Sequence, residues 1–153
     1  MQDSAGNDAA SFTATSVTNS STVAGTPPTI TGVTSSTSNG SYNTGDSITI
    51  NVLFSEAVNV VTTSGGTAPT LELETGSTNR KATYTTGTGT NTLVFTYTVE
   101  AGDTASDLDY LNNSALSLND GTIKDAAGNN ATLTLAEPGA SGSLGANLSL
   151  IHI

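Results

Sequence analysis

The sequence predicts an all-β fold: an antiparallel β-sandwich of about seven to nine short strands with little or no helix. Apolar and polar residues alternate over several short stretches, as in strands that bury one face. Many polar positions hold β-branched Thr, which favours strands, and Gly, Asn and Asp cluster between the stretches, as in turns. No stretch keeps a helical period over as many as about ten residues.

The expected strands follow one another along the whole chain. In the clearest of them, residues 46–54, Ile48, Ile50, Val52 and Phe54 share one face, while Ser47, Thr49 and Asn51 face water. Residues 91–99 repeat the pattern with Leu93, Phe95, Tyr97 and Val99. The other expected strands are residues 29–33, 69–74, 80–84, 131–135 and 148–153, with shorter apolar pairs at Leu108/Tyr110 and Leu116/Leu118. The Asp120-Gly121 step predicts a tight turn.

Composition limits the partners of this chain. Its 153 residues suit one domain and an additional segment. Thirteen acidic residues against three basic ones give a net charge of −10, which disfavours binding to nucleic acid or anionic lipid and attracts divalent cations. There is no Cys for disulfides or thiolate sites, and no apolar run reaches the roughly 18 residues of a membrane span. We expect any export signal to lie outside this sequence, because Met1-Gln2-Asp3 lacks signal-peptide features.

A repeated phrase suggests that the chain comes from a tandem array. Asp125-Ala-Ala-Gly-Asn129 is echoed near the N-terminus by Asp3-Ser-Ala-Gly-Asn7. Paired prolines at positions 27 and 28 stiffen the backbone and mark a boundary. We therefore expect residues 1–24 to be the tail strand of a preceding repeat or a donor-like N-terminal strand, residues 25–28 a Pro linker, and residues 29–153 the sandwich domain.

Several phrases in a fixed order resemble a known family. These are Thr29-Ile-Thr-Gly-Val33, Tyr42-x-x-Gly-Asp46-x-Ile-x-Ile50, Phe54-Ser-Glu56, Ala101-Gly-Asp103, Asp107-Leu-Asp-Tyr110 and Ile123-Lys-Asp-Ala-Ala-Gly-Asn129. From residue 26 to residue 153 the chain resembles the Ig-like tandem (extender) repeats of very large bacterial surface adhesins. The resemblance implies an Ig-like sandwich that acts as an extracellular spacer, on the bacterial surface or secreted. It also implies neighbouring repeats as partners, and often stiffening by calcium; we expect the isolated domain to be a monomer.

Calcium is the cofactor that the acidic residues favour, because Ca²⁺ binds carboxylate, carbonyl and water oxygens. The best candidate cluster is Asp103, Asp107 and Asp109, with Glu56 as a further ligand. Asp107 and Asp109 are two apart in an alternating stretch, so their carboxylates should project from the same face. Asp125 suits a site at a junction between repeats. The alternative is that these aspartates only cap turns.

Enzymatic activity is not expected. His152 is the single histidine, so a Ser/His/Asp triad or a His-based zinc site would depend on it alone. Glu72 and Glu74 are the outward alternates of a strand, and the chain has no Trp to bind sugar rings. Two alternatives to a spacer stay open: a sandwich module that binds glycan or ice, and a fibre subunit that assembles by strand donation from residues 1–24.

Overall fold

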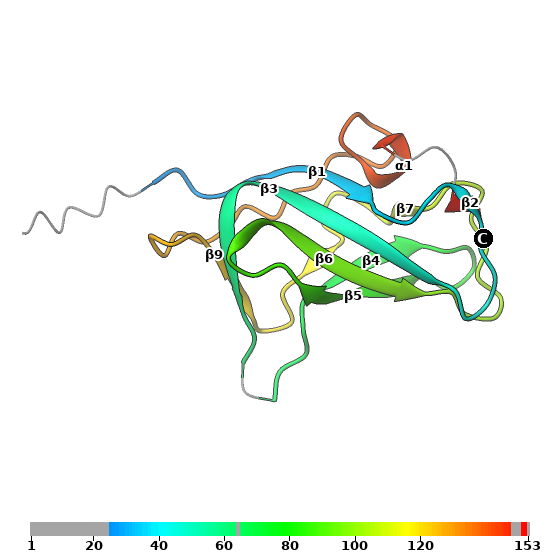
Figure 1. The fold of residues 1–153 in the computed structure, drawn as a ribbon, viewed down its shortest axis with the longest axis horizontal. Coiled ribbons are helices and arrows are strands. Elements are labelled where there is room, and N and C mark those ends of the chain that lie inside the picture. Colours follow the sequence, from blue (N-terminus) through cyan, green and yellow to red (C-terminus); the bar gives the residue numbers. More distant parts are fainter. Residues whose placement is uncertain (1–24, 64, 148–150, 153) are drawn as a thin grey trace, which may run out of the picture.

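Eight antiparallel strands form one strongly curled sheet in this computed structural model, which describes residues 25–63, 65–147 and 151–152 (Figure 1). The neighbours follow the order β1-β3-β6-β5-β4-β7, while β8 pairs with β4 and β9 with β3. A separate parallel pair joins β10 to β2. The elements are β1 (Ile30–Ser35), β2 (Gly40–Ser41), β3 (Ser47–Val61), β4 (Thr70–Glu74), β5 (Arg80–Thr86), β6 (Thr90–Thr98), β7 (Asp109–Tyr110), β8 (Leu116–Ser117), β9 (Thr122–Lys124), α1 (Leu144–Asn147) and β10 (Ile151–His152).

The predicted all-β class with very little helix is confirmed. The predicted division into two facing sheets is not confirmed, because the strands of the main sheet pair along one continuous path and enclose the core as a half-barrel. The bend lies in β3, whose first half pairs with β1 and β6 and whose last residues pair with β9. The pairing of β3 with β6 shifts register between Leu53 and Val58, as at a β-bulge. The expected end of this strand at residue 54 is therefore wrong: β3 continues to Val61, where β9 supplies a second partner.

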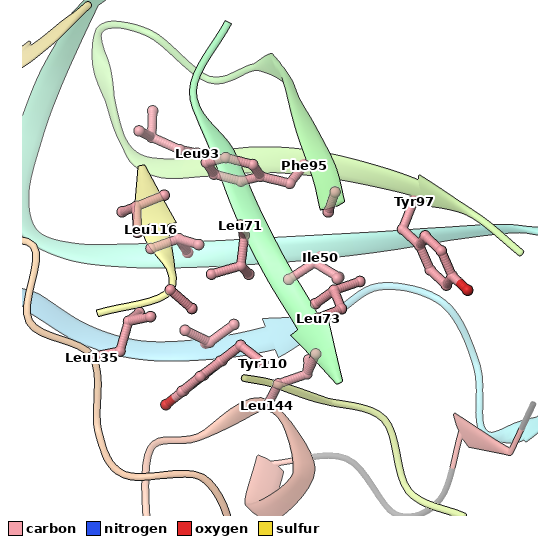
Figure 2. Close-up of a cluster of buried hydrophobic side chains, with 14 of the residues drawn as sticks. Ile50, Leu71, Leu73, Leu93, Phe95, Tyr97, Tyr110, Leu116, Leu135 and Leu144 are labelled. Carbon is pink, nitrogen blue, oxygen red and sulfur yellow. The ribbon is translucent and has the colours of Figure 1, made fainter. Parts of the chain in front are cut away.

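The core lies inside the curl and is built from the predicted inward rows. Every second residue of β3 from Ile48 to Phe54 is buried, as are Leu93, Phe95, Tyr97 and Val99 along and after β6. Figure 2 shows these rows meeting Leu71 and Leu73 of β4, with Tyr110, Leu135 and Leu144 closing the cluster from the other side. Burial of these side chains supplies most of the stabilisation, at roughly 1.5–3 kcal/mol for each large apolar residue.

The open side of the half-barrel is covered by residues 130–147, here named the closing segment. On one flank it bonds to β1 and to the residues before it: Thr132 N donates to Pro28 O (2.8 Å), and Gly142 O accepts from Val33 N (2.9 Å). On the other flank Leu135 N donates to Asn113 O (2.9 Å). The strand expected at residues 131–135 is wrong, since within the described chain this stretch makes a single isolated bridge, between Thr132 and Thr29.

The described chain enters at one end of the long axis and leaves at the other. Residue 25 lies at the end near β9, whereas β10 lies beside β2 at the opposite end (Figure 1). Of the closing strand expected at residues 148–153, only Ile151–His152 is described, and it is β10. The tail or donor strand expected at residues 1–24 lies outside the described residues. No helix among the residues that the structure describes is long and apolar enough to cross a membrane.

Candidate functional site

Asp107 and Asp109 project together from the region of β7 because the residues that alternate with them anchor the strand. Leu108 and Tyr110 are buried in the core, which turns the two carboxylates outward as predicted. β7 pairs with the end of β4 in a register that sets Asp109 directly opposite Glu74. Three acidic side chains thus line one hollow of about 410 Å³. Like charges facing each other across a strand pair are unfavourable, so this arrangement favours a cation nearby.

The geometry of the hollow depends on Asp109 and Gly145. Asp109 Oδ1 accepts a hydrogen bond from Tyr110 N (2.9 Å), and Asp109 Oδ2 accepts one from Gly139 N (2.9 Å) in the closing segment. A Cβ atom at Gly145 would lie 3.0 Å from Asp109 Oδ2 and 3.4 Å from Asp107 Oδ2. The two carboxylate oxygens therefore flank the same small space, which the missing side chain of Gly145 leaves open.

The chemistry of this cradle suits a hard cation, but the protein does not complete the coordination. Ca²⁺ takes roughly six to eight oxygen ligands. Among the described residues, no three His, Cys, Asp or Glu side chains converge closely enough to hold a metal ion. Glu74 Oε1 accepts from Gly76 N (3.2 Å), so this carboxylate is partly engaged in its own turn. A cation here would bind Asp107 and Asp109 and take its other ligands from water and backbone carbonyl oxygens.

Asp103 has a different role from the one expected. It follows the tight turn at the end of β6, and its side chain is 1 % exposed. Asp103 Oδ1 accepts from Arg80 Nε (2.8 Å), and Asp103 Oδ2 accepts from Tyr97 Oη (2.6 Å) and Glu100 N (2.8 Å). Arg80 Nη1 also pairs with Glu100 (2.8 Å). This carboxylate is fully occupied as a structural brace and does not line the hollow.

These contacts control the protonation of the brace. Burial by itself raises the pKa of Asp103, but the hydrogen bonds from Tyr97, Arg80 and Glu100 N together outweigh burial, so the pKa lies below its usual value. Burial, followed by the hydrogen bond to Asp103, raises the pKa of the Tyr97 phenol. Asp103 is therefore ionised and Tyr97 protonated at neutral pH, as the hydrogen bonds require.

Asp125 is held inside its own loop. Asn129 donates to both of its oxygens, from the backbone to Oδ1 (2.8 Å) and from the side chain to Oδ2 (2.7 Å). The side-chain hydrogen bond from Asn129 is the main cause that lowers the pKa of Asp125, helped by backbone amides of the loop. Asn129 Nδ2 also donates to Gly25 O (3.1 Å). The Asp125–Asn129 phrase thus joins its loop to the first residue of the Pro linker.

Glu56 lies away from the candidate ligand Asp103. It is exposed near the bend of β3, whereas Ser47, at the start of the same strand, pairs with Thr98 at the end of β6, just before the brace. Glu56 comes nine positions after Ser47 along β3, a span of up to about 30 Å if the strand were fully extended. Glu56 and Asp103 therefore occupy opposite ends of the sheet.

The structure adds Glu74 and Gly145 to the site, and the sequence reasoning missed both. Glu74 was recognised as an outward alternate, but only the register of β4 against β7 places it beside Asp109. Gly145 carries no sequence signal beyond its lack of a side chain. Comparison of the chain with protein-family models, characterised proteins and solved structures gives no significant match.

Proposed function

We propose that this chain is a spacer (extender) module of a bacterial cell-surface adhesin, an Ig-like domain that is extracellular and works by length and stiffness. The observation that carries the proposal is the position of its two ends: the described chain enters at one end of the long axis and leaves at the other (Figure 1). Copies joined in series would then extend along one line. Neighbouring repeats of the same chain are the partners in this proposal, and the module has no catalytic role.

The anchoring of the linker supports this proposal. Asn129 holds Gly25 O, Thr132 N holds Pro28 O, and the backbone of Thr29 exchanges hydrogen bonds with Ser55 (3.0 and 2.8 Å). Gly25, Pro28 and Thr29 are thus fixed to the domain, and the prolines restrict the backbone between Gly25 and Thr29. A linker held in this way limits bending between one module and the next.

The described surface gives little support to the other two functions. Val61 is the one large hydrophobic side chain that is widely exposed there (59 %), so the described faces offer no aromatic platform for glycan. Outward Thr residues such as Thr85 and Thr96 hydrogen-bond to each other (2.9 Å) on a curled sheet, which is a poor match to a flat ice-binding face. Assembly by strand donation would depend on residues 1–24.

We further propose that calcium stiffens the module at the cradle of Asp107, Asp109 and Gly145. An ion that bridges the strand region of Asp107 and Asp109 to the closing segment would bind only the folded state and so stabilise it. Calorimetry of the whole chain with calcium or with EDTA tests this. We expect a higher Tm with calcium, a reduced shift for Asp107→Asn, and an unchanged shift for Glu56→Gln, which removes the same charge at the other end of the sheet. Coincident transitions with and without calcium would refute a calcium role.

The spacer role is tested by the shape of an array. Several copies joined end to end should scatter X-rays as a stiff rod whose length grows in proportion to copy number. A matched array with Gly-Ser residues in place of residues 25–28 should bend and have a smaller radius of gyration. Equal radii for the two arrays would contradict the proposal that this linker is a stiff spacer element.

A further inference from the structure

β1 lies between two neighbours that hold it along its length. On its inner side it forms an antiparallel ladder with β3, from Ile30 opposite Phe54 to Ser35 opposite Ile50. On its outer side it meets the closing segment, which runs in the same direction from the bridge of Thr29 with Thr132 towards α1 (Figure 1). β1 is therefore an inner element of the closed half-barrel and not a free edge.

On the outer side of β1, the backbone of Val33 both donates and accepts a hydrogen bond. Val33 N donates to Gly142 O (2.9 Å), and Val33 O accepts from Asn147 Nδ2 (3.0 Å). The side chain of Val33 is fully buried, and Asn147 is the last residue of α1 in the closing segment. β1, which follows the first described residues, is thus bonded directly to the closing segment, which precedes β10.

This arrangement sets the direction in which a pull on the two ends would act. Tension would draw the residues before β1 towards one end of the molecule and the closing segment towards the other. Hydrogen bonds in an antiparallel ladder are perpendicular to the strands. A force along β1 therefore loads all of its ladder bonds together, whereas a sideways force breaks them one after another.

We propose that β1 is the mechanical clamp of this protein, the element whose contacts resist unfolding under tension. Its hydrogen bonds to β3 and to the closing segment are loaded in shear and set the force at which the module unfolds. The biological importance of this clamp rests on the proposed spacer function, but its existence does not. Forced unfolding depends on the barrier to unfolding and not on equilibrium stability alone. Contacts on β1 should then control the unfolding force, while equally stabilising contacts elsewhere should not.

The direction of pulling gives the first test. Because the chain has no Cys, engineered thiols attach handles at chosen positions of the full chain. We expect Thr26→Cys pulled against a C-terminal handle to unfold at a force at least about twofold higher than Thr26→Cys pulled against Asn91→Cys, which peels β1 from the end where it begins. Both exchanged side chains are exposed, so the two proteins should be equally stable at rest. Equal forces in the two directions would overturn the proposal.

Variants give the second test. Asn147→Ala removes the bond to Val33 O and should lower the axial unfolding force. Asp103→Asn, in the brace outside the clamp, should lower the urea midpoint but leave the axial force nearly unchanged. If Asp103→Asn lowers the force as much as Asn147→Ala, the force reports overall stability and the clamp is refuted. The two proposals can fail separately. A high axial unfolding force together with arrays that bend freely in X-ray scattering would refute the spacer role and leave the clamp intact.

Discussion

The phenol of Tyr97 donates a 2.6 Å hydrogen bond to Asp103 Oδ2, and both residues are buried where β6 ends. Replacing Asp103 by Asn removes one of the two carboxylates that pair with Arg80, and Asn cannot accept all the hydrogen bonds that the buried carboxylate of Asp103 accepts. We expect Asp103→Asn to lower the free energy of unfolding by about 2 kcal/mol, because a buried donor left unsatisfied costs roughly that much. Urea unfolding measures the loss. Asp107→Asn removes an exposed carboxylate and should cost far less, so equal losses would contradict the assigned brace.

Acid should destabilise the protein through the same carboxylate. The pKa of Asp103 in the folded protein lies below its ordinary value of about 3.9 in the unfolded chain. The stabilisation is therefore fully present above about pH 4 and is lost as the pH falls through the folded pKa. Urea midpoints measured from neutral pH downwards should fall for the native protein and fall less steeply for Asp103→Asn. Asp125 shifts in the same direction, so some acid sensitivity should persist in the variant.

Alkali should act through Tyr110, whose hydroxyl donates to Ala136 O (2.7 Å) in the closing segment. Burial, then the charges of Asp109 and Glu137, raises the pKa of Tyr110 to about 12. This stabilisation is present below the ordinary value of about 10 and is lost as the pH rises towards the folded value. Tyr110→Phe should cost about 1 kcal/mol at neutral pH. Its alkaline unfolding should begin at higher pH than that of the native protein; an identical onset would show that Tyr110 is not responsible.

Gly145→Ala distinguishes cation binding at the cradle from the stability of the fold. The added methyl group would enter the space between the Asp107 and Asp109 oxygens, so the calcium-induced rise in Tm should be lost. Without calcium the variant should be close to the native protein in stability, because the preference for Ala over Gly in a helix, roughly 0.5–1 kcal/mol, is offset by the tight contact of the new methyl group with Asp109 Oδ2. Calorimetry with and without calcium checks both signs. An undiminished calcium response would place the cation elsewhere.

Asn129→Ala tests the junction loop. Removing the side-chain donor should raise the pKa of Asp125 towards its ordinary value, since that hydrogen bond is the main cause of its lowering. NMR titration of the carboxyl carbon follows this change. Gly25, which loses its partner, should show faster amide relaxation, whereas the loop glycine Gly45 serves as an unaffected reference. An unchanged pKa would mean that the backbone amides alone hold the carboxylate.

The apolar rows could be read from the sequence because burial repeats every second residue. Ile48, Ile50, Val52 and Phe54 are apolar, and each of these inward side chains is buried. The continuation of β3 could not be read, since Ser55, Glu56 and Ala57 are all exposed and break the pattern at the bend. Residues 131–135 alternate like a strand, yet they cover the core without forming a ladder. The alternation of apolar and polar residues shows which side chains are buried. It does not show which neighbouring strand, if any, hydrogen-bonds to the backbone.

The candidate site shows the same limit. Asp103 and Asp107 carry identical groups four residues apart, and only the approach of Arg80 and Tyr97 from other strands separates a buried brace from an exposed carboxylate. The pairing of Asp109 with Glu74 depends on the register between β4 and β7. The outward direction of Asp107 and Asp109 was predictable because it is a local property of alternation.

The ion pairs of Arg80 affect the charge balance of the protein surface. With this guanidinium paired to Asp103 and Glu100, Lys81 and Lys124 are the other basic residues in a chain with thirteen acids. Identical modules in series would repel one another over a screening length of about 10 Å at 0.1 M ionic strength, and over longer distances in dilute salt. Fresh water would therefore straighten such an array, and brine would relax it.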